Sequence, residues 1–352
     1  MPGLRAGGLA EIFGVAMKAF PKPSAGLVLG AIAALCAAPA LADDLRSTQV
    51  LVEGGIFLAH SETEAAFARL DAPRPTDAAL IPKPTAYWET GGASFGQAER
   101  TRRIGSSGST TQLRLGVDRD LGGGLIVGAA TSAGFGSVGS GDLGAQAIGQ
   151  HADVYGRIDR GRFFTKVLFG GSLFDFSAID RGSGSAKSSA DALSMGARTA
   201  AQLGANFTLR GVKLTPTVAL AAYANRLGAY DECGGGQPLS FDARTATAAI
   251  GSFRLTGQRN FRLDPRHTVD LHGFVGAEDV LGYGSSRAIA VDQTGARQRL
   301  AREIAPTGRG LVSGVGVGTT LAPGVSMTVD YDYGRRDSIA THASRARLGV
   351  SF

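Results

Sequence analysis

Apolar and polar residues alternate at every second position through most of this chain, and this feature constrains its fold more than any other. In "QLRLGVDRD" (112–120) apolar residues stand at 113, 115 and 117, between polar and charged ones. In "VSMTVDYDYG" (325–334) the same spacing recurs, with Ser, Thr and Asp on the polar side. Successive side chains of a β-strand point to opposite faces, so the pattern predicts strands with one apolar and one polar face.

The alternation recurs about twelve times, which predicts an all-β chain with an even number of strands. Several segments are longer than the five or six residues of an ordinary globular strand and suit tilted membrane strands of about 9–11 residues with extensions. The expected strands are Tyr87–Gly96, Thr111–Asp120, Leu125–Phe135, Ala152–Asp159, Phe163–Phe174, Leu193–Leu209, Val212–Asn225, Thr245–Arg262, His267–Leu281, Gly310–Leu321, Val325–Arg335 and His342–Phe352.

The connections between these segments alternate in length. Tight turns are expected at "LGGG" (121–124), "RGR" (160–162), "RG" (210–211), "LDPR" (263–266) and "APG" (322–324). Between them lie stretches that we interpret as long loops, such as "GSVGSGDLGAQAIGQ" (136–150) and "AYDECGGGQPLSFDAR" (229–244). Short turns at one end and long loops at the other are typical of outer-membrane barrels.

The N-terminus has the features of a signal peptide over residues 1–42. Lys18 and Lys22 form a basic region, an apolar run follows over 25–35, and "ALA" (40–42) is a small-residue cleavage site. We expect cleavage between Ala42 and Asp43, and Met17 is the more natural start. The apolar run is too short to span a membrane, and no later stretch approaches the required length. The chain is therefore expected to be exported.

Two architectures fit an exported chain of such strands: a soluble sandwich with its polar face in water, or a membrane barrel with its polar face in the lumen. The signal peptide, the even strand number and the mixture of Arg and Asp on the polar face favour the barrel. Lipid offers no hydrogen-bond partner to a free strand edge, so such a sheet must close. The net charge of +6 comes from dispersed Lys and Arg without a nucleic-acid-reading motif, which argues against nucleic-acid binding.

Residues 43–86 differ from the strands and read as a linker. "SETEAAFARL" (61–70) predicts a short helix, because Ser61 and Glu64 have the spacing of a capping box. Four prolines between 73 and 84 then interrupt regular structure. The expected organisation is a signal peptide over 1–42, a linker with a helix over 43–86, and a barrel over 87–352.

Five stretches together resemble the β-domain of bacterial type V autotransporters over roughly 87–352. They are "TQLRLGVDRDLGGGLIVGAATSAG", "ADVYGRIDRGRFFTKVLFGGS", "VKLTPTVALAAYA", "GLVSGVGVGTTLAPGVSMTVDYDYG" and the terminal "HASRARLGVSF". The resemblance implies a twelve-stranded antiparallel transmembrane barrel in the bacterial outer membrane, with the N-terminal helix inside the pore. It also implies outer-membrane lipid and the barrel-assembly machinery as partners, a monomer, and an assembly signal formed by Leu348, Val350 and Phe352.

The sequence departs from the family in one respect. Only residues 43–86 separate the expected cleavage site from the barrel, which is too little to fold alone as a passenger. The asparagines, Asn206, Asn225 and Asn260, all lie in the barrel region, so the linker lacks the residue that some relatives use for release. We expect an outer-membrane barrel without a substantial passenger, in a structural or transport role. A small-solute channel and a surface protein acting through its long loops remain alternatives.

The strand phase predicts which residues line the lumen. These are Arg114, Asp118, Arg157, Lys166, Arg198, Arg254, Asp270, His272, Glu278, Asp330 and Asp332. His272 and Asp270 share a face about 7 Å apart along the strand, the spacing of a possible hydrolytic dyad. Pore lining explains them more simply, so we predict no enzyme.

Other possible sites carry little chemistry. "GFGSVG" (134–139) matches a dinucleotide motif, but no helix follows it, so we expect no cofactor. The histidines lack metal-ligand spacing on one element, so we expect no metal. Cys233 would be the one cysteine after the cleavage site, which excludes an internal disulfide.

Overall fold

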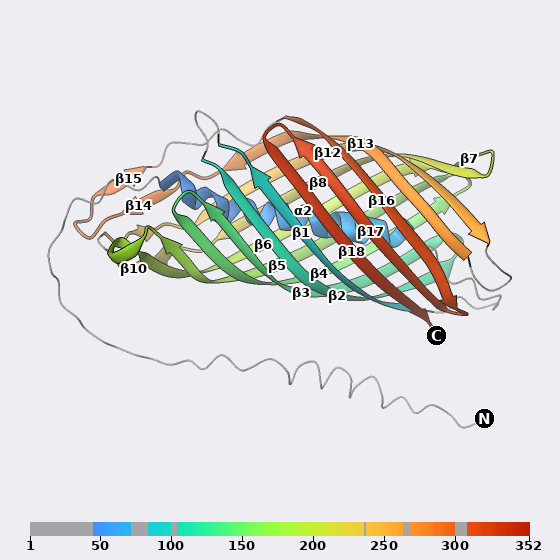
Figure 1. Ribbon diagram of the computed structural model, residues 1–352, viewed down its shortest axis with the longest axis horizontal. Helices are drawn as coiled ribbons and strands as arrows, with labels where there is room; N and C mark the ends of the chain where they lie inside the picture. The colour runs from blue at the N-terminus through green and yellow to red at the C-terminus, as the bar shows by residue number, and fades with distance from the viewer. Residues whose placement is uncertain (1–44, 72–83, 100–103, 236, 263–267, 300–307) are drawn as a thin grey trace, which may run out of the picture. The chain divides into compact units, whose positions relative to one another are not determined.

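The long alternating segments form a barrel in the computed structural model, which describes residues 45–71, 84–99, 104–235, 237–262, 268–299 and 308–352 (Figure 1). The expected signal peptide, its cleavage site at Ala42 and Asp43, and the prolines from 73 to 82 lie outside these residues. The twelve barrel strands are β1 (Thr85–Gln97), β2 (Ser106–Gly122), β3 (Leu125–Ser140), β4 (Leu143–Arg160), β5 (Phe163–Arg181), β6 (Ser188–Ala205), β8 (Val212–Leu227), β12 (Arg244–Arg262), β13 (Thr268–Ser285), β16 (Arg309–Ala322), β17 (Val325–Arg336) and β18 (Ile339–Ser351).

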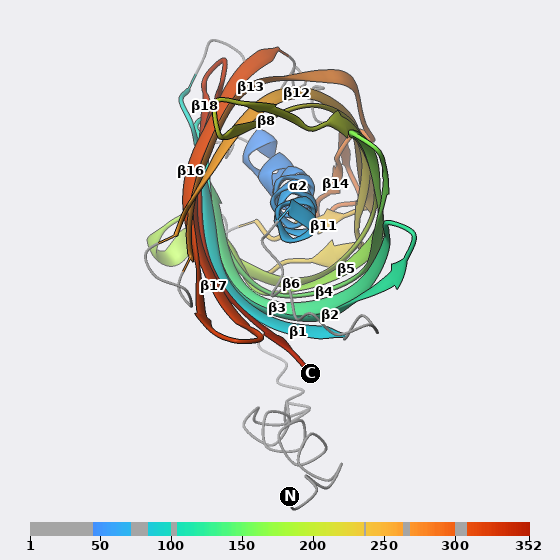
Figure 2. The same ribbon diagram turned by 90° about the vertical axis from the view of Figure 1, so that its right-hand side faces the viewer.

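Each barrel strand pairs antiparallel with its neighbours in this order, and β1 pairs with β18 to close the sheet. In the closing register Thr85 lies opposite Ser351 and Gln97 opposite Ile339. Figure 2 shows the resulting ring of strands, seen along the barrel. Closure pairs the edge strands with each other, as the sequence required of a sheet in lipid. The prediction of a twelve-stranded antiparallel barrel is confirmed.

Small elements extend the barrel at both ends (Figure 1). β7 (Phe207–Leu209) pairs with the start of β8 beside the tight turn at 210–211, and β10 (Cys233–Gly234) pairs with the start of β6 at the opposite end. A second sheet contains β9 (Tyr230–Asp231), β11 (Ser240–Phe241), β14 (Ile289–Val291) and β15 (Arg297–Arg299). In this sheet Tyr230 stacks on Phe241 with ring centroids 4.7 Å apart, and burial raises the pKa of Tyr230 to about 12. The predicted long loop at 229–244 therefore contains short strands.

The predicted loop at 136–150 is wrong. β3 continues to Ser140 and β4 begins at Leu143, with a tight turn between them. The alternation persists here with small residues: Ala145 and Ala147 are buried, while Gln146 and Gln150 are exposed. In this stretch the apolar residues face inward and the polar ones outward, the opposite of the rest of the barrel. The segment was therefore not recognised as a strand in the sequence.

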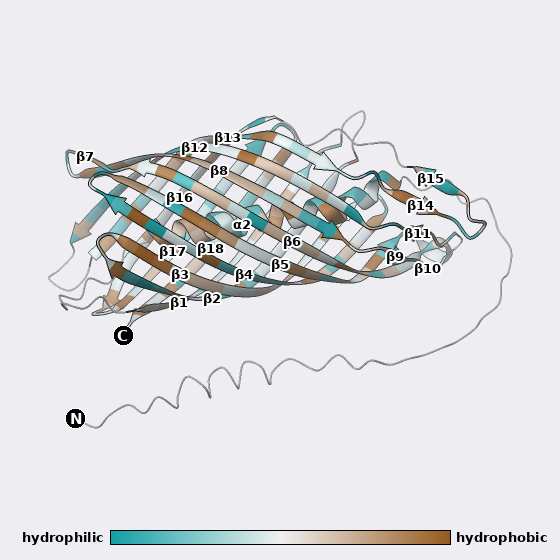
Figure 3. Ribbon diagram, turned by 180° about the vertical axis from the view of Figure 1, so that it is seen from behind, coloured by the Kyte–Doolittle hydropathy of each residue, from teal (hydrophilic) through white to brown (hydrophobic). Residues whose placement is uncertain are grey.

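The outer face of the barrel is apolar, as the alternation of apolar and polar residues predicted. Exposed large side chains such as Val154, Phe169 and Val275 are 56–63 % accessible, while their chain neighbours are buried or half-buried. Apolar residues recur along the barrel strands in Figure 3. The one charged residue on the apolar side of β12, Arg259, is exposed near the end of its strand and lies over the ring of Phe261, 5.0 Å from the centroid. Tight turns close the strands at this end, and Gly124 and Gly324 adopt positive φ angles there.

One long helix lies inside the ring of strands (Figure 2). A 3-10 turn, η1 (Leu45–Thr48), leads into α2 (Gln49–Asp71); a second turn, η2 (Gly184–Ala186), lies between β5 and β6. The helix begins twelve residues before the predicted one, and Ser61 lies in its interior, so the predicted capping box is wrong. Gly54 and Gly55 weaken the helical signal because glycine disfavours helix. Among the described residues, no helix combines the length and apolar character needed to cross a membrane.

The lumen differs from the uniformly polar one that the strand phase suggested. Towards the long-loop end, the N-terminal half of α2 packs into an apolar core with inward residues of the strands. These include Leu143, Ala147, Phe176, Ile179, Leu227, Ala246 and Ile250. Towards the short-turn end, the C-terminal half of α2 is surrounded by charged residues. Helix and wall are thus matched in polarity along the barrel.

Candidate functional site

The contact between α2 and the barrel wall is the candidate functional site. At the N-terminal half of the helix, this contact consists of close packing. A side chain at Gly55 would overlap the amide of Asn225, which donates through Nδ2 to the carbonyl of Val52 at 2.9 Å. A Cβ at Gly54 would lie 3.2 Å from Val138 Cγ1. The two glycines therefore let the helix backbone approach β8 and β3. The Gly pair that weakens the helix in isolation is needed for its packing.

A charged cluster holds the middle of the helix. Arg114 on β2 donates through Nη1 to Glu62 of α2 and through Nη2 to Asp153 on β4, both at 2.8 Å. Arg198 on β6 binds the same Asp153 at 2.6 Å and contacts His151 at 3.1 Å. Arg114 and Glu62 are each only 1 % exposed. Buried charges require such partners, so this cluster fixes the helix at one height and rotation.

A second cluster holds the C-terminal end of the helix. Arg69 lies 2.5 Å from Asp118 on β2, with its guanidinium over the ring of Tyr87. Asp71 accepts from Lys166 on β5 at 2.6 Å and from Arg157 on β4 at 2.9 Å. Two helix charges of opposite sign therefore meet wall charges of the complementary sign.

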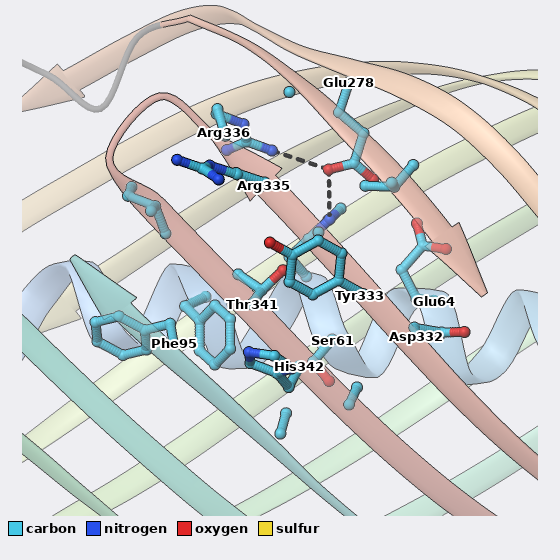
Figure 4. A pocket seen from close by; sticks show the side chains of 18 of the residues that line it. Ser61, Glu64, Phe95, Glu278, Asp332, Tyr333, Arg335, Arg336, Thr341 and His342 are labelled. Atoms are coloured by element: carbon cyan, nitrogen blue, oxygen red, sulfur yellow. Dashed lines mark hydrogen bonds and ion pairs between the residues drawn. The ribbon is translucent and has the colours of Figure 1, made fainter. Parts of the chain in front are cut away.

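The opposite side of the helix faces a third group of charges. Glu64 pairs with Arg254 on β12, whose other nitrogen donates to Glu278 on β13 at 2.8 Å. Arg336 on β17 also donates to Glu278, at 2.9 Å (Figure 4). His60 lies 2.9 Å from the hydroxyl of Tyr223 and 3.5 Å from Glu278.

The start of the helix is tied by hydrogen bonds in which at least one partner is uncharged. Gln49 donates to Ser285 on β13 at 2.9 Å, and the Tyr283 hydroxyl donates to Glu53 at 2.5 Å. Arg244 on β12 donates to Thr48 at 2.8 Å. Together with the charged clusters, these contacts hold the helix along its full length.

The last strand contributes two arginines to the lumen. Arg345 pairs with Asp332 on β17, and Arg347 pairs with Glu89 on β1 through Nε at 2.7 Å. Arg347 also reaches the carbonyl of Ala65 on the helix, at 3.5 Å. The terminal strand therefore links the closing seam of the barrel to α2.

His272 lies between two carboxylates. Its Nδ1 is 3.1 Å from Asp270 and its Nε2 is 2.8 Å from Asp330. The expected pair with Asp270 thus exists, but Asp330 across the sheet occupies the nitrogen that a hydrolytic base would turn to its nucleophile. Within the described ranges, these two carboxylates are the hydrogen-bond partners of the His272 ring.

One group of side chains has the spacing of metal ligands. His60, Glu64 and Glu278 place one ligand atom each within 4.8 Å of the others. Arg254 binds both carboxylates and Arg336 binds Glu278, so their charge is already met by cations of the protein. The arrangement is accounted for as part of the helix-binding network.

The residues that the phase assigned to the lumen fall into two sets. One set touches α2 directly: Arg114, Asp118, Arg157, Lys166, Arg198, Arg254 and Glu278. The other set joins the networks around it: Asp270, His272, Asp330 and Asp332. Sequence reasoning missed the helix partners Glu62, Glu64, Arg69 and Asp71, and the wall residues Asp153 and Glu89. The available sequence signal was that residues 62–71 carry charges of both signs on a helix expected inside a charged lumen.

Comparison with known proteins agrees with this geometry. The autotransporter β-domain family model matches residues 87–332. The translocator domain of the autotransporter NalP from Neisseria meningitidis superposes with a TM-score of 0.70 at 15 % identity, covering 88 % of this chain and 99 % of that one. The β-domain of the Bordetella autotransporter BrkA gives 0.58 at 19 % identity, covering 77 % and 100 %. No curated protein matches the sequence. The chain belongs to the autotransporter β-domain family of Gram-negative outer-membrane barrels.

Proposed function

We propose that this protein is a plugged outer-membrane barrel in which α2 stays in the lumen after assembly and obstructs it. In this role the barrel is a membrane anchor of transport-type architecture rather than an open pore. The observation that carries the proposal is the charge matching of the helix. Glu62, Glu64, Arg69 and Asp71 each meet a wall residue of opposite charge.

Withdrawing the helix would separate these pairs. Removing one partner of a buried ion pair costs about 3–5 kcal/mol, because the other charge is left unpaired. Two of these four pairs are almost completely buried, Arg69 with Asp118 and Arg114 with Glu62. Water that replaced the helix would restore part of this energy, yet the apolar core at the other end would also be exposed.

A disulfide between helix and wall tests whether α2 occupies the lumen in cells. The pair Gly54→Cys and Val138→Cys suits a disulfide, since the Cβ at 54 and the Cγ1 at 138 lie 3.2 Å apart. Cys233 is replaced by Ser in this background. We expect the cross-link to form in the outer membrane and to change the mobility of the unreduced protein on a denaturing gel.

The matched control keeps Gly54→Cys and moves the second cysteine to Phe135, which is 63 % exposed on the outer face of the same strand. This pair should stay reduced. Equal failure of both pairs to cross-link in folded barrels would overturn the plug. A small-solute channel with the helix displaced is the alternative, and it predicts that outcome together with a large conductance.

The expectation that no substantial passenger is carried stays a prediction. The mass of the protein recovered from outer membranes tests it. We expect a single species lighter than the 36.0 kDa of the whole sequence by the signal peptide. An additional released fragment would contradict it.

A further inference from the structure

Exposed arginines gather on one side of the barrel at its short-turn end. Those on or between β2 and β12, here called the basic rim, are Arg119, Arg160, Arg162, Arg210 and Arg259. The outward residues that the structure describes at the same end of β16, β17, β18 and β1 are uncharged, among them Leu321, Met327, Leu348 and Trp88. The basic rim is therefore a patch on one half of the barrel.

The charge of the basic rim is not neutralised by the carboxylates closest to it along the chain. Asp120 accepts from the backbone N–H of Gly122, and Asp159 accepts from Nη2 of Arg157, both at 2.8 Å. Arg160 donates to the carbonyl of Gly123 on the neighbouring turn at 3.3 Å, a contact that leaves its positive charge without a counter-charge. The rim therefore offers net positive charge to an anion outside the barrel.

Apolar side chains lie between the arginines of the rim. Arg162 lies 5.7 Å from the ring centroid of Phe163 and 5.9 Å from that of Phe207, within the range of cation–π contacts. These rings are 61 % and 43 % exposed, and Leu209, next to Arg210, is 60 % exposed. A surface that is both apolar and cationic fits the boundary between acyl chains and headgroups, where aromatic rings and the charged ends of long side chains gather. It suits a lipid better than a soluble acidic partner.

The position of the rim selects the kind of lipid. The short turns of outer-membrane barrels lie on the periplasmic side, so the rim meets the phospholipids of the inner leaflet. Arginine presents a planar fork of N–H donors that binds two phosphate oxygens at once. A zwitterionic headgroup carries its own cation beside the phosphate, whereas an anionic headgroup does not. A patch of uncompensated arginines therefore favours anionic lipid.

We propose that the basic rim is a binding site for an anionic phospholipid of the phosphatidylglycerol class. Arg160 and Arg162 on the turn between β4 and β5 bind the phosphate. The acyl chains lie along the outward side chains of β5, such as Val167 and Phe169, which are 41 % and 58 % exposed. The site lies on the outside of the barrel, so it does not depend on the plug.

Lipid retention by the purified full chain tests the site. The protein is reconstituted in vesicles of equal parts phosphatidylglycerol and phosphatidylethanolamine with matched acyl chains, and is then extracted in mild detergent. Native mass spectrometry counts the lipids that stay bound. We expect a severalfold excess of phosphatidylglycerol, which falls at high salt because exposed charges are screened. Equal retention of the two lipids would overturn the proposal.

Two double variants with the same loss of charge locate the site. Arg160→Gln/Arg162→Gln should lower the excess of phosphatidylglycerol at least about fivefold, since one arginine near an anionic surface changes affinity by about that factor. Arg309→Gln/Arg335→Gln removes two exposed arginines at the long-loop end and should retain lipid as the native chain does.

The mobility of unheated samples on a denaturing gel shows that both variants are folded. Native-like retention by folded Arg160→Gln/Arg162→Gln would overturn the site. Recovery of peptidoglycan fragments on the native chain in place of lipid would also overturn it, and would assign the rim to the cell wall.

Discussion

Arg114 on β2 lies 2.8 Å from Glu62 on α2, and both side chains are 1 % exposed. We expect Glu62→Gln to lower the free energy of unfolding of the refolded barrel by up to about 3 kcal/mol, because Arg114 loses a buried charged partner. Urea titration measures the change. Glu99→Gln removes an exposed carboxylate and should change nothing. Equal stabilities of the Glu62→Gln and native barrels would contradict a role for this pair in seating the helix.

Gly316 and Gly318 form a matched pair on the inner face of β16. A methyl group at 316 would overlap Asp330 and His272, while one at 318 would lie 3.6 Å from its nearest neighbours. We expect Gly316→Ala to destabilise the refolded barrel by about 1–3 kcal/mol through overpacking, and Gly318→Ala to be near neutral. Thermal unfolding followed by circular dichroism measures both. A larger loss for Gly318→Ala would show that the lumen side chains are arranged differently.

The inward and outward faces of the strands could be predicted from the sequence because the two faces of a membrane strand meet different surroundings. Alternation alone therefore assigns Leu113 and Val117 to the outer face, and Arg114 and Asp118 to the lumen. This logic fails at the long-loop end, where Ala145 and Ala147 face a helix and Gln146 faces outward. The pattern continues there with the opposite polarity, so the strand resembles a loop.

The partners of the lumen residues could not be predicted in the same way. Alternation assigns Arg114 to a face, but its pairing with Glu62 depends on the height and rotation of α2. Those are set jointly by contacts far apart in the chain, such as Gln49 with Ser285 and Asp71 with Lys166. The helix itself was underestimated because Gly54 and Gly55 lower local propensity, while packing against Asn225 and Val138 more than offsets the loss.

Replacing His272 separates a structural role from a catalytic one. Both ring nitrogens are held by carboxylates, so His272→Ala leaves Asp270 and Asp330 without the group that joins them. We expect lower stability of the refolded barrel in urea and no change in hydrolysis of lipid or peptide substrates. His272→Gln should recover part of the stability by restoring a hydrogen bond. Hydrolysis by the native protein that His272→Ala abolishes would establish the enzyme that the sequence argued against.

Phe352 should matter for assembly more than for stability. Its ring is 57 % exposed, and its backbone N–H donates to the carbonyl of Pro84 at 3.2 Å. The ring therefore contributes little to packing within the barrel. We expect deletion of Phe352 to lower the amount of folded barrel in the outer membrane, while the refolded variant unfolds in urea as the native chain does. Phe163→Ala, which removes another exposed ring (61 %), should leave the amount in cells unchanged. Normal outer-membrane amounts of the deletion variant would show that the terminal ring is not the signal that the barrel-assembly machinery reads.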